Sequence, residues 1–317
     1  MATPRKQQVC LDNTPYYHCV SRCVRRGFLC GEDPSTKKSY QHRRGWIESK
    51  LKQLTRCFTI DICSYAVMSN HYHLIVHIDK DAALALSDHE VIQRWTSLYR
   101  TPFIIKRLLN KQIKTKAERA LCKMTVKLWR ERLYDLSWFM RTINLDIARR
   151  SNKEDQCTGH FWEGRYHCQS LLCTKALLAM MIYADLNPIR AGIATLPENS
   201  KYTSIFTRIH ALKNMDQSDS FLMPFVGDKA KVKGLPFSLL DYIKLVDWSG
   251  RLIKRKGSGF ITENTPPLLS RVQISPDKWY SICTTLGTRK ARLVGSDSAI
   301  RRALKRSFKT RGWSTKL

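Results

Sequence analysis

Three of the nine histidines of the chain lie in one nine-residue stretch, SNHYHLIVH, at residues 69–77. Side chains of a β-strand alternate between its two faces, so His71 and His73 would point to one face and Tyr72 to the other. Two adjacent imidazoles can supply two nitrogen ligands to a divalent metal ion. A His-x-His pair also arises by chance about 0.2 times in a chain of this composition, so a metal site needs a further ligand.

A second group of polar side chains lies in the segment TKALLAMMIYADLN, residues 174–187, which is expected to form a helix that ends near Pro188. Tyr183 and Asn187 are four residues apart and would share one face of this helix. A tyrosine among Ala, Leu and Met is typical of a packed core, and it can also serve as a nucleophile. Asn187 could complete a three-ligand site with the histidine pair, one helical turn from the Tyr183 phenol.

The motifs MSNHYHLIVH and, about 110 positions later, YADLNPIRAG at residues 183–192 resemble those of the single-tyrosine HUH transposases. They are most similar to those of the REP-associated tyrosine transposases of bacteria. The resemblance covers about residues 12–200 and includes an aromatic segment, GHFWEGRYH, between the two motifs. It implies a DNA strand transferase that acts on single-stranded DNA or on palindromic repeats folded as hairpins.

The resemblance also assigns roles to four residues. His71 and His73 would bind a divalent metal ion, Mg²⁺ or Mn²⁺, with Asn187 as third ligand, and Tyr183 would attack the DNA. A phenol has a pKa near 10 and is a poor nucleophile at neutral pH unless a cation draws charge from the phosphate. Attack would leave a 5′-phosphotyrosine and a free 3′-OH, and rejoining would need no ATP. The sequence contains no phosphate-binding G-x-x-x-x-G-K-[ST] loop, in agreement with that expectation.

The chain departs from the family pattern in three places. Ser69 stands where the family usually has proline, the connection over residues 79–158 is longer than in compact relatives, and the extension beyond residue 200 is largely absent from them. These departures concern the DNA target and the oligomeric state, monomer or homodimer. His18 and His77 lie on predicted strands and are interpreted as buried or edge histidines.

The charge of the chain indicates an anionic polymer as partner. Fifty-five Lys and Arg face 26 Asp and Glu, which gives a net charge of +29, far more than solubility requires. Ten basic residues and one acidic residue lie between Arg289 and Lys316, in a segment expected to contain a helix after Ser298. The residues predicted to bind DNA are Arg165, Tyr166 and Arg190, which could hold phosphates or stack on bases, and Arg301, Arg302, Lys305 and Arg306 in the extension.

The order of predicted elements is strand, helix, strand, strand, helices, strand, helix. This order favours an α+β fold with a ferredoxin-like antiparallel sheet, helices on one face, a long helical insertion and a mainly helical, basic C-terminal extension. A strand is expected over residues 159–172. The predicted organisation is a catalytic domain over residues 1–200 with the insertion at about 79–158, a linker over 201–235 and the extension over 236–317.

The sequence also predicts a cellular location. It contains no apolar run long enough for a membrane span and no export signal at its beginning, and its eleven cysteines are an odd number. We therefore expect reduced thiols, no membrane partner and a bacterial cytoplasm in which the protein associates with the nucleoid.

Two other function classes remain compatible with parts of the sequence. A non-catalytic nucleic-acid-binding protein derived from such a transposase explains the charge and the aromatic residues, but it gives no reason for two histidines, a tyrosine and an asparagine at matching positions. A small-molecule metalloenzyme explains the histidines but not the net charge.

Overall fold

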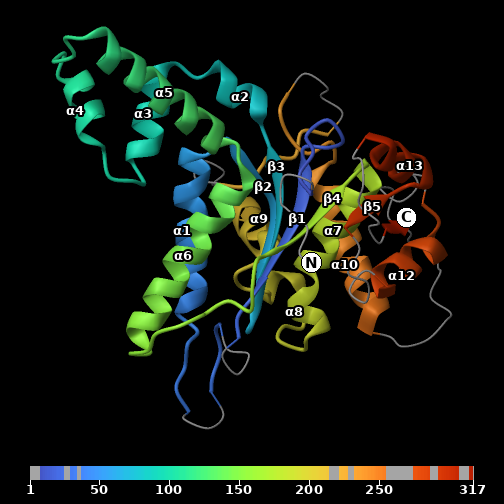
Figure 1. The fold of residues 1–317 in the computed structure, drawn as a ribbon. Helices are drawn as coiled ribbons and strands as arrows, with labels where there is room; N and C mark the ends of the chain where they lie inside the picture. Colours follow the sequence, from blue (N-terminus) through green and yellow to red (C-terminus); the bar gives the residue numbers. More distant parts are fainter. Residues whose placement is uncertain are drawn as a thin grey trace.

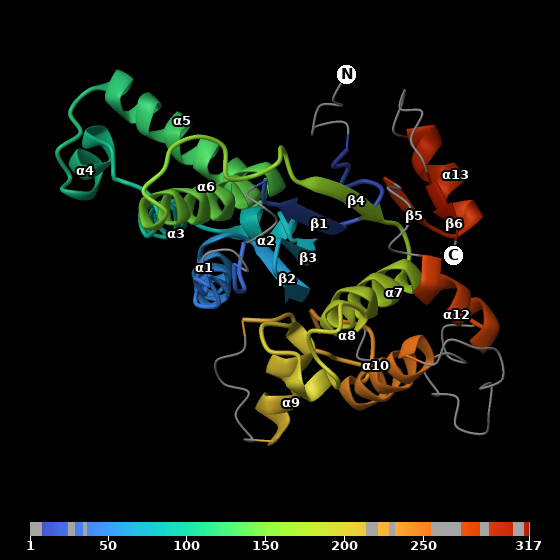
Figure 2. The same ribbon diagram turned by 90° about the horizontal axis from the view of Figure 1, so that it is seen from below.

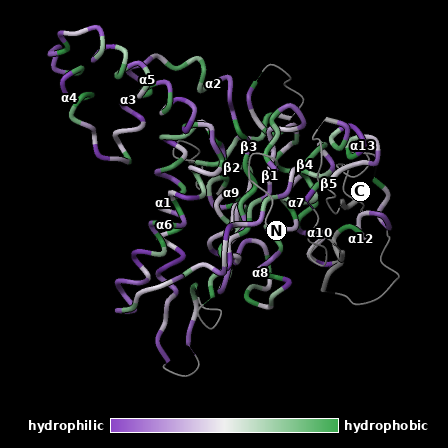
Figure 3. The backbone as a smooth tube through the Cα atoms, in the orientation of Figure 1, coloured by the Kyte–Doolittle hydropathy of each residue, from purple (hydrophilic) through white to green (hydrophobic). Residues whose placement is uncertain are grey.

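The computed structural model describes residues 8–24, 29–33, 37–213, 221–227, 232–254, 274–285, 292–306 and 314–316. They form a central β-sheet with helices on both of its faces (Figure 1). Figure 3 shows that hydrophobic residues gather along the strands in the middle of the molecule. Among the described helices, none combines the length and the apolar character that a membrane span requires.

The sheet has four antiparallel strands that correspond to the predicted ferredoxin-like core. They are β1 (Tyr16–Arg22), β2 (Ile60–Val67), β3 (His71–Ile78) and β4 (His167–Leu171). Two short strands, β5 (Leu293–Gly295) and β6 (Ser314–Lys316), extend the sheet in parallel, and the order is β2-β3-β1-β4-β5-β6. As predicted, β2 and β3 form an antiparallel pair joined at Ser69 and Asn70. β1 lies between β3 and β4, so side chains from these three strands meet on one face.

The first face of the sheet is covered by α1 (Arg43–Cys57) and α6 (Leu136–Glu154). Leu51 and Leu54 of α1 lie in one apolar cluster with Leu74 of β3 and Phe139 of α6. This helical layer continues into the insertion. Its helices are α2 (Lys80–Ala85), α3 (Asp88–Thr96), α4 (Phe103–Leu109) and α5 (Lys116–Leu133), which agrees with the predicted helical insertion.

The second face is covered by α7 (Thr174–Asp185), and α9 (Ser204–Lys213) and α10 (Leu239–Lys254) lie in the same layer (Figure 2). The sequence predicts helices on one face only, and this part of the prediction needs correction. β2 and β3 are buried along almost their whole length, on both alternating sets of side chains. Strands of this kind require cover on both faces.

The C-terminal region packs onto the same core. α8 (Asn187–Arg190) continues α7, and a short 3₁₀ helix, η2, spans Pro197–Asn199. α12 (Pro276–Thr285) and α13 (Asp297–Arg306) confirm the mainly helical character of the extension. The boundaries expected near residues 200 and 235 stay a prediction, and the described residues on either side of them lie against one another.

The expected strand over residues 159–172 is shorter in the structure. Only His167–Leu171 form a strand, and Gly159 before them has a positive φ of 101°. Phe161 is 2% exposed and belongs to the apolar cluster that includes residues of β1 and α6. The aromatic composition of this segment therefore reflects packing of a loop rather than a long strand.

A buried carboxylate fixes the end of α7 against α9 and α10. Asp185 is fully buried and accepts hydrogen bonds from Ser204 Oγ at 2.5 Å, from the backbone N–H of Ile205 at 2.9 Å and from Tyr242 Oη at 2.6 Å. Because buried carboxylates are stable only when their oxygens are satisfied, this network holds the last turn of α7 in one position. That turn carries Tyr183.

Candidate metal and nucleophile site

The histidine pair lies at the beginning of β3, on the face that α7 covers. The ring centroids of His71 and His73 are 4.8 Å apart. Tyr72 points to the other face, where its hydroxyl donates to Asn144 of α6, so the predicted alternation is observed. Ring nitrogens of neighbouring histidines on one strand face can bind one ion together.

Tyr183 and Asn187 approach this pair from the end of α7. The Tyr183 ring lies 5.6 Å from the His73 ring between centroids, nearly perpendicular to it. Asn187 opens α8, is 9% exposed, and donates from Nδ2 to the carbonyl oxygen of Tyr183 at 2.9 Å. Since the amide nitrogen is used within the helix, the amide oxygen is the atom that Asn187 can offer to a cation. The structure thus brings the helix tyrosine directly against one of the two histidines.

Two further residues belong to the site and are absent from the sequence prediction of functional residues. His18 Nε2 and His73 Nδ1 share a hydrogen bond of 2.9 Å, and His18 Nδ1 and Gln169 Oε1 share one of 2.6 Å. The first strand, the histidine strand and β4 each supply one member of this chain. In the sequence, only the alternating pattern of PYYHCVSR points to His18 as a strand residue. That pattern does not show that His18 meets His73, because the contact depends on how the strands pair.

The remaining nitrogen of His73 indicates how the site could bind a cation. His73 is 4% exposed, and its Nε2 atom is buried without a hydrogen-bond partner among the described residues. A buried polar atom without a partner is costly, and a metal ion is one group that can satisfy it. The donor set of imidazole nitrogens and an amide oxygen fits a divalent ion such as Mn²⁺ or Mg²⁺.

Burial keeps the three histidines of the site neutral at pH 7. It lowers the pKa of His18 to about 4 and that of His71 to about 4, with a smaller effect of the Arg22 charge on His71. Burial also lowers the pKa of His73 well below its ordinary value. Neutral imidazole is the form that binds metal ions, because protonation occupies the lone pair.

The phenol of Tyr183 is protonated at neutral pH. Burial raises its pKa above the ordinary value near 10, and the charges of Arg190 and Arg22 and the Asn187 side chain oppose that rise. The guanidinium carbon of Arg190 lies 5.2 Å from the centre of the Tyr183 ring. Arg22 pairs in register with His71 across β1 and β3. Arg190 therefore lies over the phenol ring, and Arg22 acts on the phenol through its charge. Of these two cations, only Arg190 is among the residues predicted from the sequence.

The buried histidines lead to a prediction for the pH dependence of stability. In the unfolded chain the three imidazoles bind protons below about pH 6.5. In the folded chain His18 and His71 do so only near pH 4, and burial holds the pKa of His73 well below its ordinary value. Their contribution to stability is therefore present above pH 6.5 and lost as the pH falls. Asp185 opposes this loss, because burial raises its pKa to about 6 and the folded state holds its proton more tightly.

Because Asp185 offsets one of the three histidines, the unfolded protein binds up to about two more protons than the folded protein between about pH 6 and pH 4. We expect the free energy of unfolding of the metal-free protein to fall by up to about 3 kcal/mol per pH unit in this range. Urea unfolding in the presence of a chelator at pH 7, 6 and 5 measures it. Equal unfolding free energies at pH 7 and pH 5 would show that the histidines are not neutral in the folded protein.

The other residues predicted to bind DNA lie in two regions. Arg165 is exposed in the loop before β4, and Tyr166 is 7% exposed and packs in the apolar cluster with α1 and α6, so its ring is not presented to solvent. Arg301, Arg302 and Lys305 are exposed on α13. Arg306 ends α13, and its side chain lies outside the described part of the structure.

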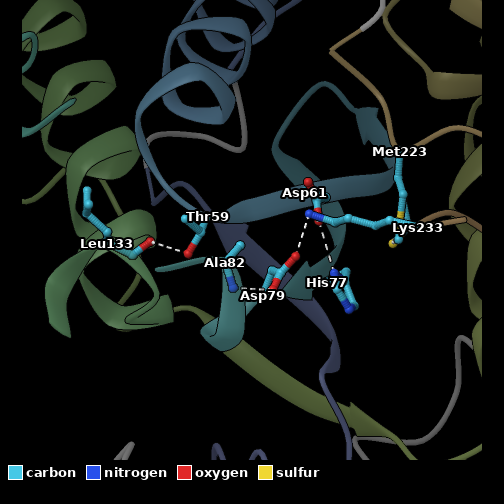
Figure 4. A network of polar contacts seen from close by, with 9 residues as sticks. Thr59, Asp61, His77, Asp79, Ala82, Leu133, Met223 and Lys233 are labelled. Carbon is cyan, nitrogen blue, oxygen red and sulfur yellow. Dashed lines mark hydrogen bonds and ion pairs between the residues drawn. The ribbon is translucent and has the colours of Figure 1, made fainter. Parts of the chain in front are cut away.

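A second group of possible metal ligands lies at the other end of the histidine strand. Asp61, His77 and Asp79 each place one ligand atom within 4.8 Å of the others and could hold a metal ion. Figure 4 shows the ammonium of Lys233 at this position, 2.8 Å from Asp61 and 2.7 Å from Asp79. Because Lys233 already supplies a positive charge to both carboxylates, a metal ion would have to displace it. His77 bonds to Asp61 at 3.0 Å and is thus a histidine in an ion-pair network.

Comparisons with known proteins give one structural likeness. A solved structure of a REP-associated tyrosine transposase bound to a REP hairpin matches this chain with a TM-score of 0.36 and 11% sequence identity, over 62% of this chain and 79% of that chain. These values are too low to establish a family or a function. No family model matches the sequence, and no curated protein matches it.

Proposed function

We propose that this protein is a metal-dependent DNA transposase that cleaves and rejoins single-stranded or hairpin DNA through a 5′-phosphotyrosine intermediate. The observation that carries the proposal is the position of Tyr183 beside His73, whose buried Nε2 has no partner among the described residues. A net charge of +29 gives the chain a strong attraction for a polyanion. A phenol, neutral imidazoles and flanking guanidinium groups are the components that phosphoryl transfer to a tyrosine needs.

His71, His73 and Asn187 would hold the metal ion, Mg²⁺ or Mn²⁺. When bound, the ion would withdraw charge from a phosphate oxygen and polarise the leaving oxygen. His73 is held by its hydrogen bond to His18, and Asn187 by its bond to the α7 backbone. Both ligands are therefore oriented before substrate arrives, which lowers the cost of assembling the site.

The chemical step is a transesterification. Tyr183 Oη attacks the phosphorus, a bond between them forms, and the bond from phosphorus to the 3′ oxygen breaks. The phenolic proton is balanced by the proton taken up by the leaving 3′-OH, and no external energy source is needed. Arg190 would bind a non-bridging oxygen of that phosphate, because its guanidinium lies over the phenol ring and carries a fixed positive charge. Arg22, whose charge also acts on the phenol from its position opposite His71, would add a second cation for the same phosphate.

The basic residues outside the site suit the remainder of a hairpin substrate. Arg301, Arg302, Lys305 and Arg306 on α13 and Arg165 before β4 would contact phosphates of a stem or of its flanking strand. Such contacts hold the DNA in position without selecting its sequence. The protein would work as a monomer or homodimer in the bacterial cytoplasm, associated with the nucleoid.

Covalent capture separates this proposal from the alternative of a non-catalytic nucleic-acid-binding protein. The protein is incubated with hairpin oligonucleotides that carry a label at either end, with Mn²⁺ or Mg²⁺, and then denatured in SDS. Attack by tyrosine retains the 3′-terminal fragment on the protein, so the 3′ label is expected to migrate with the protein and the 5′ label to be released. A protein that only binds DNA retains neither label after denaturation.

A further inference from the structure

We infer that Gln169 and His18 are positioning residues that set the tautomer of His73 and so make its Nε2 atom a metal ligand. The inference rests on the proposed function only in naming a metal as the group bound. Together with His73, these two residues form a series of hydrogen bonds across three strands, with Gln169 on β4, His18 on β1 and His73 on β3. His18 and His73 are 3% and 4% exposed, so water has little access to either ring.

The donor and acceptor in each of these hydrogen bonds follow from the side-chain amide of Gln169. The oxygen of the Gln169 amide faces His18 Nδ1 at 2.6 Å, and an amide oxygen can only accept. His18 Nδ1 must then carry the hydrogen, and in a neutral imidazole the other nitrogen, Nε2, must accept. The partner of that nitrogen is His73 Nδ1 at 2.9 Å, so His73 Nδ1 donates. His73 Nε2 is left with a lone pair and no hydrogen.

This arrangement has a functional consequence, because the tautomer decides what His73 can bind. With the lone pair on Nε2, His73 can coordinate a cation and cannot donate to a phosphate. If the Gln169 amide were turned so that its nitrogen faced His18, donor and acceptor would be exchanged in both hydrogen bonds of the series. A hydrogen would then lie on His73 Nε2. The ring would then be a donor and not a metal ligand. The orientation of the Gln169 amide therefore decides whether His73, two strands away, is a metal ligand or a hydrogen-bond donor.

Metal-bound histidines ordinarily donate their second nitrogen to a carboxylate, a backbone carbonyl or a water. Here that acceptor is another histidine, which is itself held by an amide. The rings of His18 and His73 are stacked, with 5° between their planes and 5.1 Å between centroids, and Tyr183 borders both rings. The series of hydrogen bonds thus fixes the plane of the His73 ring as well as its tautomer.

Nitrogen NMR of histidine side chains tests the inference in the metal-free wild-type protein. We expect both His18 and His73 to carry hydrogen on Nδ1, whereas free imidazole side chains favour hydrogen on Nε2. A His73 ring with hydrogen on Nε2 would overturn the inference. This measurement needs neither DNA nor a variant, so it stands even if substitutions impair folding.

Two substitutions at one position provide the second test. Gln169→Leu removes the acceptor and is expected to weaken Mn²⁺ binding by about 10- to 100-fold, the usual effect of losing such an outer partner. Gln169→Glu keeps an acceptor for His18 Nδ1 and is expected to retain the wild-type affinity and tautomers. Binding is measured by the electron paramagnetic resonance signal of free Mn²⁺, with thermal unfolding as a check of the fold. Equal loss in both variants, or loss in neither, would contradict the role of Gln169.

These measurements are separable from the test of the proposed function. If no covalent DNA adduct forms while the tautomers and the Mn²⁺ affinities behave as expected, the positioning role stands and the transferase proposal fails. If an adduct forms but Gln169→Leu binds Mn²⁺ as tightly as the wild type, the positioning role fails alone.

Discussion

Replacement of Tyr183 by phenylalanine is expected to abolish the SDS-resistant adduct between the protein and a labelled hairpin oligonucleotide. The loss should exceed about 10³-fold, because the hydroxyl is the atom that forms the bond to phosphorus. The ring itself remains, and with it the contact to His73 at 5.6 Å. Folding and DNA affinity should therefore change little, as measured by thermal unfolding and by gel shift of the same oligonucleotide.

Tyr16→Phe is the matched control for this substitution. Tyr16 lies on β1 and packs in the same apolar cluster as Tyr183, but its ring lies against His77, 4.9 Å between centroids, at the other end of the histidine strand. The control is expected to form the adduct at the wild-type rate. If Tyr183→Phe formed as much adduct as Tyr16→Phe, another residue would be the nucleophile.

Replacement of His73 by alanine is expected to remove measurable binding of Mn²⁺ at the site and, with it, cleavage. Removing a residue that hydrogen-bonds to a metal ligand lowers metal affinity by about 10- to 100-fold. Removing the ligand itself should lower the Mn²⁺ affinity by more than about 100-fold. The substitution also leaves His18 Nε2 without its partner in a buried position, so some loss of stability is expected as well. Mn²⁺ affinity and adduct yield are measured on protein that is shown to be folded.

His77→Ala supplies the comparison within the same strand. His77 faces the same side of β3 as His73, four residues along, and bonds to Asp61. The group of Asp61, His77 and Asp79 could itself hold a metal, and this pair of variants decides between the two positions. If His77→Ala lost Mn²⁺ binding and cleavage while His73→Ala kept both, the metal centre would lie at Asp61 and Asp79 and the present assignment would be wrong.

The local parts of the site could be predicted because each depends on one element. The two-residue repeat of a strand places His71 and His73 on one face, and the four-residue spacing on a helix connects Tyr183 with Asn187. The turn at Ser69 and Asn70 is also read from polar residues between two apolar runs. Strand pairing, by contrast, decides which histidine meets His73, and a single sequence does not determine that pairing.

For this reason His18, Gln169 and Arg22 escape the sequence prediction of functional residues. Gln169 faces His18 only because β1 and β4 pair in one register, and Arg22 faces His71 only because β1 and β3 pair in another. A shift of either pairing by one residue would turn these side chains to the other face.

The same limit explains the errors on a larger scale. Helices on both faces follow from strands that are buried on both sides, a pattern that short apolar runs do not distinguish from a core helix. The aromatic segment around Tyr166 has the composition of a strand or of a base-stacking surface, but Tyr166 is buried in the apolar cluster that includes residues of α1 and α6. Composition alone does not show which side of a chain faces solvent.

The central claim is that the Tyr183 oxygen forms a covalent bond with a DNA phosphate when a divalent metal is present. Mass spectrometry of the trapped adduct tests it most directly, because the tryptic peptide of residues 176–190, ALLAMMIYADLNPIR, contains Tyr183 as its only tyrosine. After nuclease and trypsin digestion we expect this peptide to carry a nucleotide bound through its 5′-phosphate, and only in samples with Mn²⁺ or Mg²⁺. If the purified adduct yielded this peptide only in its unmodified form, or carried the nucleotide on a different residue, the account would be contradicted.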